Sequence, residues 1–210
     1  MHVVSVNVGR ARELRGRSFD GVTGIFKEPA DAAVAVTTLG LKDDAICDGK
    51  HHGGPDQAVY LYRQEDYDFW SKELGRTVAP GTFGDNLTVA GLPAPALPIG
   101  ARLTFPDLLL EITAPRIPCN TLAQRMDDPA FAKAFVRAER PGLYARVIRE
   151  GRVTAGDAFT LEGADAGATT VELFRDSYRR LDADRLRHWL ALPIDARTRA
   201  KFEAELEART

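Results

Sequence analysis

Residues 49–62 read GKHHGGPDQAVYLY, and this stretch carries the most informative strand signal of the chain. Two glycines and a proline interrupt regular structure, and an apolar, aromatic run typical of a β-strand follows at once. Similar short runs between Gly, Pro and Asp recur up to about residue 162; they are VVSVNV, AVAVTTL, AVYLY, NLTV, ARLTF, LLLEIT and AFTLEG. They predict a mainly β fold, either a barrel or a sandwich. Apolar residues at helical spacing predict two peripheral helices, over residues 65–74 and 128–138.

The chain changes character at the small-residue segment GADAGA, residues 163–168. Beyond it the spacing of apolar residues predicts three helices, the first two capped by Thr170 and Asp182. We therefore predict a β domain over residues 1–165 and a small α-helical subdomain over residues 166–210. The helical part carries mixed charges, which favours a bundle packed on the β domain or on a second subunit over a DNA-reading unit.

The composition gives no reason to expect a nucleic acid or a membrane as partner. The 210 residues include 28 basic and 30 acidic side chains, a formal net charge of −2. The first residues lack the continuous apolar core of a signal peptide, and no apolar run approaches the length of a membrane span. We expect a cytoplasmic protein in which Cys47 and Cys119 are free thiols.

The stretch ITAPRIPCNTL, residues 112–122, places a thiol beside a guanidinium on a stiff loop. Pro115 and Pro118 stop the preceding strand and fix the backbone around Arg116 and Cys119. The positive charge favours the thiolate of Cys119, which attacks electrophiles or binds a soft metal. Arg116 could equally clamp a phosphate or a carboxylate. The alternative for Cys119 is a buried small apolar residue, and Cys47 lies among acidic residues that would raise its pKa.

Two glycine-containing stretches could supply backbone N–H groups to an anion. GTFGDNLTV, residues 81–89, suits a tightly curled loop before a strand, although an ordinary turn would have the same pattern. Gly53 and Gly54 could form an anion nest beside two adjacent histidines. In extended backbone the rings of His51 and His52 point apart, so only one can share a site with Cys119, and His52 could also be a plain turn residue.

Four stretches together resemble the MOSC domain family, named for the C-terminal region of molybdenum cofactor sulfurases. In order they are HGGPDQAVYLY, GTFGDNL, PRIPCNTL and GLYARVIREGRVTAGDAFTL. Within the family the chain is most similar to the stand-alone, YiiM-like bacterial branch, which carries a three-helix C-terminal extension. In the resemblance, His52 matches the family histidine and His51 does not. Asp85 stands where many relatives have Glu.

The resemblance implies a MOSC-type β-barrel with peripheral helices and a molybdenum cofactor (molybdopterin) site. Cys119 would be the molybdenum ligand or a sulfur acceptor, and His52 would orient the site or handle protons. The residues expected to bind the cofactor are Arg116, Lys27, Gly53, Gly54, Asp56, Phe83, Gly84 and Asn86, with Asp56 an alternative to His52 for handling protons.

The function that the resemblance favours is the reduction of N-hydroxylated bases such as 6-N-hydroxylaminopurine, a detoxification role. The chain shows no flavin, haem or iron–sulfur signature, so a separate electron-donor protein would be needed. One alternative is a non-catalytic carrier of sulfur or cofactor on Cys119. Another is an interaction module whose helical tail binds a partner or forms a homodimer.

Overall fold

The apolar run of the opening stretch forms strand β7 (Val59–Arg63), which is buried on both faces. Alternate side chains of a strand point to opposite faces. Val59 and Leu61 accordingly enter one hydrophobic core, and Tyr60 and Tyr62 enter another. The computed structural model describes residues 1–49, 52–93, 97–163 and 167–209.

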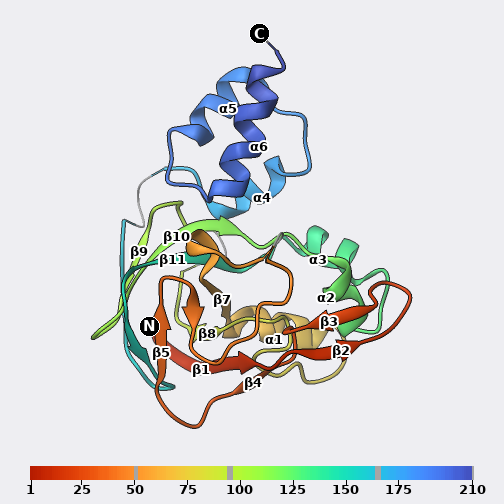
Figure 1. Ribbon diagram of the computed structural model, residues 1–210, viewed down its shortest axis with the longest axis vertical. Helices are drawn as coiled ribbons and strands as arrows, with labels where there is room; N and C mark the ends of the chain where they lie inside the picture. Colours follow the sequence, from red (N-terminus) through yellow and green to blue (C-terminus); the bar gives the residue numbers. More distant parts are fainter. Residues whose placement is uncertain (50–51, 94–96, 164–166, 210) are drawn as a thin grey trace.

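β7 lies inside an eight-stranded sheet that makes up most of the fold (Figure 1). In order across the sheet the strands are β13 (Thr160–Glu162), β9 (Arg102–Thr104), β10 (Leu109–Pro115), β11 (Leu143–Arg149), β7, β8 (Leu87–Ala90), β1 (His2–Gly9) and β4 (Lys27–Pro29). The pair β7–β8 is parallel, and every other neighbouring pair is antiparallel. The predicted mainly β character is therefore confirmed.

The expected closed barrel is not found within the described ranges, because no strand ladder there joins the end strands β13 and β4. The sheet curls instead. The Val3 N–H donates to the Asp157 carbonyl at 2.9 Å, and the Phe159 N–H donates to the Met1 carbonyl at 3.2 Å. These bonds bring the segment before β13 alongside β1 without extending into a ladder.

Two smaller sheets and three helices surround the large sheet. One sheet contains β12 (Gly151–Val153), β5 (Val34–Thr37) and β6 (Gly40–Leu41), and the other contains β2 (Arg12–Leu14) and β3 (Gly21–Thr23). The helices are α1 (Gln64–Glu73), α2 (Asn120–Arg125) and α3 (Phe131–Ala138). α1 and α3 confirm the two predicted peripheral helices, whereas α2 was not anticipated.

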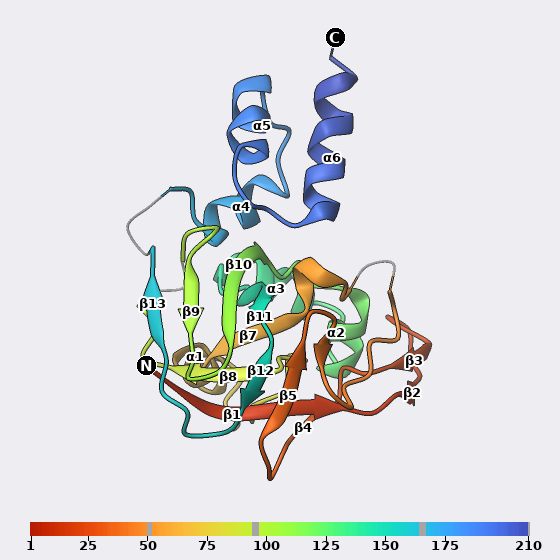
Figure 2. The ribbon, with the colours of Figure 1, turned by 60° about the vertical axis from the view of Figure 1, so that its left-hand side comes forward.

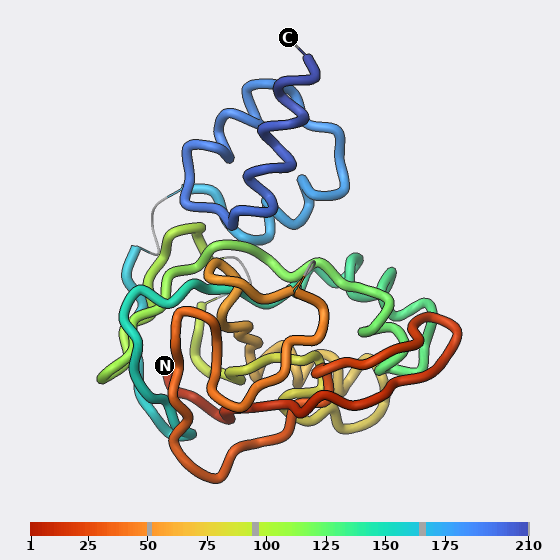
Figure 3. The backbone as a smooth tube through the Cα atoms, in the orientation of Figure 1, coloured from red at the N-terminus to blue at the C-terminus, as the bar shows by residue number. Residues whose placement is uncertain are grey.

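The hairpin β2–β3 lies beside α2 (Figure 3), where the Ser18 N–H donates to Gln124 Oε1 at 3.2 Å. This contact brings the N-terminal part of the chain next to the segment that follows β10. The pocket described below forms between these two parts.

The C-terminal helices α4 (Thr170–Asp176), α5 (Ala183–Leu190) and α6 (Ala196–Glu207) stand at one end of the large sheet (Figures 1 and 2). Asp182 caps α5 as predicted, since its carboxylate accepts from the Arg185 N–H at 2.8 Å. The cap of α4 is Thr169 rather than Thr170, because Thr169 stands three residues before Glu172 and the two form a capping box.

The larger core continues from the sheet into the helical tail. Leu61 and Leu110 of the sheet belong to the same cluster of buried residues as Leu173, Trp189 and Phe202 of the tail. The domain division at residues 165 and 166 stays a prediction, with the predicted linker partly outside the described residues. No helix in the described part of the chain is long and apolar enough to cross a membrane.

Candidate functional site

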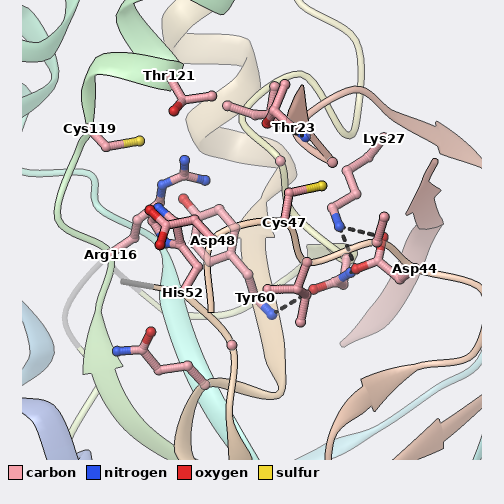
Figure 4. Close-up of a pocket in the computed structure, with 18 of the residues that line it drawn as sticks. Thr23, Lys27, Asp44, Cys47, Asp48, His52, Tyr60, Arg116, Cys119 and Thr121 are labelled. Carbon is pink, nitrogen blue, oxygen red and sulfur yellow. Dashed lines mark hydrogen bonds and ion pairs between the residues drawn. The ribbon is translucent and has the colours of Figure 1, made fainter. Parts of the chain in front are cut away.

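A pocket with about 680 Å³ of empty space, part of it open to solvent, lies between the loop after β6, the loop before β8 and the β10–α2 connection. Figure 4 shows Cys119 and Arg116 at one side of it, Lys27 and Asp44 at the other, and Cys47 between them in this view. Its floor rests on the aromatic core, to which Tyr60 belongs. The pocket thus joins residues that are far apart in the sequence.

Cys119 stands between β10, which ends at Pro115, and α2, whose N-cap it is. Burial would raise the pKa of its thiol, but hydrogen bonding to His52 and the positive charge of Arg116 outweigh burial and lower the pKa to about 6. The thiolate is therefore the main form of Cys119 at neutral pH. The reactivity of this thiol stays a prediction, which the lowered pKa supports.

Arg116 is 4% exposed and is fixed from two sides. Its Nη1 donates to the Phe83 carbonyl, and its guanidinium carbon lies 4.9 Å from the centre of the Tyr60 ring. Burial tends to lower its pKa, but Tyr144, Tyr60 and Cys119 together raise it. Its buried Nε has no hydrogen-bond partner among the described residues. A buried guanidinium with a free donor is suited to an acceptor group of a ligand.

His52 lines the pocket, and its Nδ1 lies 3.4 Å from the hydroxyl of Tyr144. Tyr144 comes from β11, and its pKa is raised, mainly by burial, so the hydroxyl stays protonated. Together with Cys119 these groups form a row of thiolate, imidazole and phenol. Such a row can hold or pass a proton at the pocket wall. His51 lies outside the described residues.

Lys27 also lines the pocket, but its charge is compensated. Its ammonium contacts both carboxylate oxygens of Asp44, and the two side chains are 7% and 4% exposed. Asp44 also accepts from the Gly9 N–H at 2.8 Å and from Asn86 Nδ2 at 2.9 Å. Burial lowers the Lys27 pKa, and Asp44 opposes that effect. Lys27 is thus part of a buried ion pair and not an independent anion-binding cation.

The GTFGDNL loop contributes Gly84 and Asn86 to the pocket, whereas its Asp85 has a structural role. Asp85 is fully buried and accepts from Tyr67 and from Thr88, the latter at 2.6 Å. Gly84 has φ 79°, and a Cβ there would lie 3.2 Å from Arg116 Nη1. Glycine at this position therefore permits the approach of Arg116.

Gly53, also predicted to bind a cofactor, lines the pocket. Three further residues with the same predicted role do not line it, namely Phe83, Gly54 and Asp56. Phe83 is fully buried in the aromatic core and contributes only its carbonyl, which holds Arg116. Gly54 precedes the 3₁₀ helix η1 (Pro55–Gln57) and has φ 83°. Asp56 points away from the pocket: it pairs with Nε of Arg146 in β11 at 3.0 Å and accepts from the Ala196 N–H of the helical tail at 2.9 Å.

Tyr144, Tyr60, Asp44 and Cys47 are pocket residues that the sequence analysis did not select as functional. Both tyrosines lie in strands whose apolar pattern hides a pocket-facing position. The Cys47 pKa is raised, first by partial burial, with Asp44 acting in the same direction. Cys47 is therefore a thiol at neutral pH, in contrast to Cys119.

The curled sheet, the helical tail and the pocket with a low-pKa cysteine define a sheet-dominated protein with a thiolate site. The model of the MOSC domain family matches residues 48–160. The matched segment includes both Arg116 and Cys119, and it spans more than half of the chain. The chain therefore belongs to the MOSC domain family.

Several relatives are known by sequence or structure. Uncharacterized protein YflK of Bacillus subtilis is 36% identical over 157 residues, 73% of this chain and 70% of that protein. Protein YiiM of Escherichia coli is 30% identical over 154 residues, 71% and 68% of the two chains. A protein named reductase from Gibberella moniliformis is 31% identical over 146 residues, 66% of this chain but 25% of that protein. The crystal structure of YiiM from Geobacillus stearothermophilus is similar with a TM-score of 0.80 and 26% identity, covering 98% of both chains.

Proposed function

We propose that the chain is an oxidoreductase that binds a molybdenum cofactor and reduces N-hydroxylated compounds, including N-hydroxylated bases. The observation that carries the proposal is the Cys119 thiol, which lines the pocket with a pKa of about 6. The relative named reductase supports the same chemical class. Cys119 would be the protein ligand of the metal, because a thiolate suits a soft metal centre.

The pocket residues fit such a cofactor in two respects. Cys119 supplies the thiolate, and Arg116 supplies a buried guanidinium whose Nε, unpartnered in the described part of the chain, can donate to an anionic group. Gly84 leaves the Arg116 side of the pocket free of a side chain. Asn86 and Gly53 complete that part of the proposed binding site, whereas Lys27 would act only through its pair with Asp44.

The reaction takes up two protons and two electrons for each N–OH group, and it yields an amine and water. When bound, the cofactor would supply the two-electron chemistry. The protein residues would bind the substrate and supply protons. His52 supplies an imidazole, a side chain suited to taking up and releasing protons, and the protonated Tyr144 hydroxyl lies 3.4 Å from its Nδ1. The electrons would come from a separate protein, and the proposed location of the reaction is the cytoplasm.

Turnover by the loaded protein tests the proposal. Protein made in a host that synthesises the cofactor is mixed with a chemical electron donor and a hydroxylaminopurine, and the aminopurine product is measured. We expect product with the wild type and none with Cys119→Ala, while Cys47→Ser serves as the matched cysteine control. Loaded wild-type protein that makes no product from any N-hydroxylated base or amidoxime would contradict the reductase function.

A second candidate function is a carrier that accepts sulfur or cofactor on Cys119. The same low pKa favours it, because a thiolate is the form that attacks a sulfur donor. A protein that retains the cofactor but shows no turnover in the same assay, and that takes up sulfur on Cys119 from a persulfide donor, would support this function.

A further inference from the structure

We propose that Arg197, in the C-terminal helix α6, is a positioning residue of the Cys119 site, holding the His52 segment in the conformation that faces the thiol. The helical tail is then part of the site's architecture. The inference goes beyond the proposed reductase function. It concerns the thiol and imidazole of the protein without cofactor, so its failure and the failure of the reductase function are separable.

The guanidinium of Arg197 makes several hydrogen bonds to the loop that carries His52. Nη1 of Arg197 donates to the Gly53 carbonyl at 2.8 Å and to Gln57 Oε1 at 3.1 Å. Nη2 donates to the Gly49 carbonyl at 3.0 Å and to the His52 carbonyl at 3.1 Å. A planar guanidinium with several donors in fixed directions can tie several acceptors into one arrangement. These four contacts span the segment that carries His52.

Neighbouring residues of α6 hold the same segment. The Ala196 N–H donates to Asp56 Oδ2 at 2.9 Å. Gln57 Nε2 donates to Oδ1 of Asp195, the N-cap of α6, at 3.3 Å. The start of α6 is therefore joined to Asp56 and Gln57 of η1, and Arg197 extends this contact to His52.

The segment needs such support because its own backbone is permissive. Gly53 and Gly54 both have positive φ, at 69° and 83°, and glycine adds no side chain that could fix them by packing. A second cavity, lined in part by His52, Gln57, Tyr144 and Arg197, lies behind the loop. On the side of this cavity, the polar contacts from α6 restrain the loop, while Ile46 packs against Gly53 elsewhere.

The consequence for the site follows from the role of His52. His52 lines the same pocket as Cys119, and its Nδ1 lies 3.4 Å from the Tyr144 hydroxyl. Loss of Arg197 would let the loop sample other conformations, so the imidazole would face the thiol for a smaller fraction of the time.

The experiment measures the hydrogen-exchange rates of the His52 and Gln57 backbone N–H groups, which donate to the Asp48 and Gly54 carbonyls at 2.9 and 3.0 Å. For Arg197→Ala we expect both groups to exchange about tenfold faster than in the wild type, because the loop opens more often. Arg199→Ala is the matched control, because Arg199 donates to the Leu190 and Leu192 carbonyls inside the tail. Its loop exchange rates should equal those of the wild type even if its thermal stability falls.

Equal exchange rates at His52 and Gln57 in Arg197→Ala and the wild type would overturn the proposal. A purely structural role would lower the unfolding temperature of the Arg197 and Arg199 variants and speed their loop exchange equally, and this result would also overturn it. If Arg197→Ala does not fold, Arg197→Gln decides, because it keeps a polar side chain of intermediate length but loses the fork. Unchanged loop exchange in that variant counts against the positioning role.

Discussion

Replacing His52 with Ala should raise the pKa of the Cys119 thiol. With a pKa of about 6, roughly 90% of the wild-type thiol is ionised at about pH 7. His52 provides the largest lowering influence, while burial acts in the opposite direction and remains in the variant. An upward shift of at least about one unit, equivalent to about 1.4 kcal/mol, would leave half of the thiol or less ionised at about pH 7.

The assay is a titration of the ultraviolet absorbance of the thiolate in a Cys47→Ser background, with Cys119→Ser as the blank. In the wild type the thiolate signal should be lost as the pH falls through about 6, because the lowered pKa stabilises the ionised form above that value. His188→Ala is a matched control, since His188 is exposed in the helical tail. A His52→Ala titration midpoint equal to that of the wild type would refute the assigned cause.

Three further changes test other parts of the site. Tyr144→Phe removes the hydroxyl beside His52 Nδ1 and should slow turnover by about tenfold without loss of bound molybdenum. Unchanged turnover would show that Tyr144 takes no part in proton transfer. Asp44→Asn leaves the buried Lys27 ammonium without its countercharge and should lower the free energy of unfolding by about 3–5 kcal/mol in urea denaturation. The double variant Asp44→Asn, Lys27→Met should recover most of this loss. A loss smaller than about 1 kcal/mol in Asp44→Asn would mean that solvent reaches the ion pair. Gly84→Ala places a Cβ on a residue with left-handed backbone, 3.2 Å from Arg116 Nη1, and should lower the free energy of unfolding by about 1–2 kcal/mol in the same measurement. Gly75→Ala is the control, because Gly75 also has positive φ but has no neighbouring atom that a Cβ would meet, so it gives the backbone contribution alone.

Much of the fold could be predicted because its signals are local. The apolar run that becomes β7 and the Asp182 cap of α5 are readable from neighbouring residues, whereas the cap of α4 is one residue earlier than predicted. Strand β11 was not among the predicted runs, since Arg146 and Arg149 interrupt its apolar pattern. The structure explains Arg146: it pairs with Asp56 and Glu111, so the strand carries its charge at a partly buried position.

Site features that depend on residues within one motif could be predicted from the sequence. Features that depend on contacts between residues far apart in the sequence could not. Cys119 and Arg116 are neighbours in sequence, and the influence of Arg116 on the thiol could be inferred from that spacing. The neutralisation of Lys27 by Asp44 could not be inferred, because Lys27 lies in β4 and Asp44 lies in the loop after β6. Asp56 was selected for its place beside the glycines, yet its carboxylate meets a helix that begins about 140 residues later.

The most direct test of the central claim is the molybdenum content of the purified protein, measured by mass spectrometry after production in a host that makes the cofactor. Wild type, Cys119→Ala and Cys47→Ser are purified in parallel, since the two cysteines line the same pocket and differ in ionisation. We expect molybdenum in the wild type and in Cys47→Ser, and its loss from Cys119→Ala. Equal molybdenum in the wild type and Cys119→Ala, or none in a wild type made by a competent host, would contradict the assignment of Cys119 as the ligand.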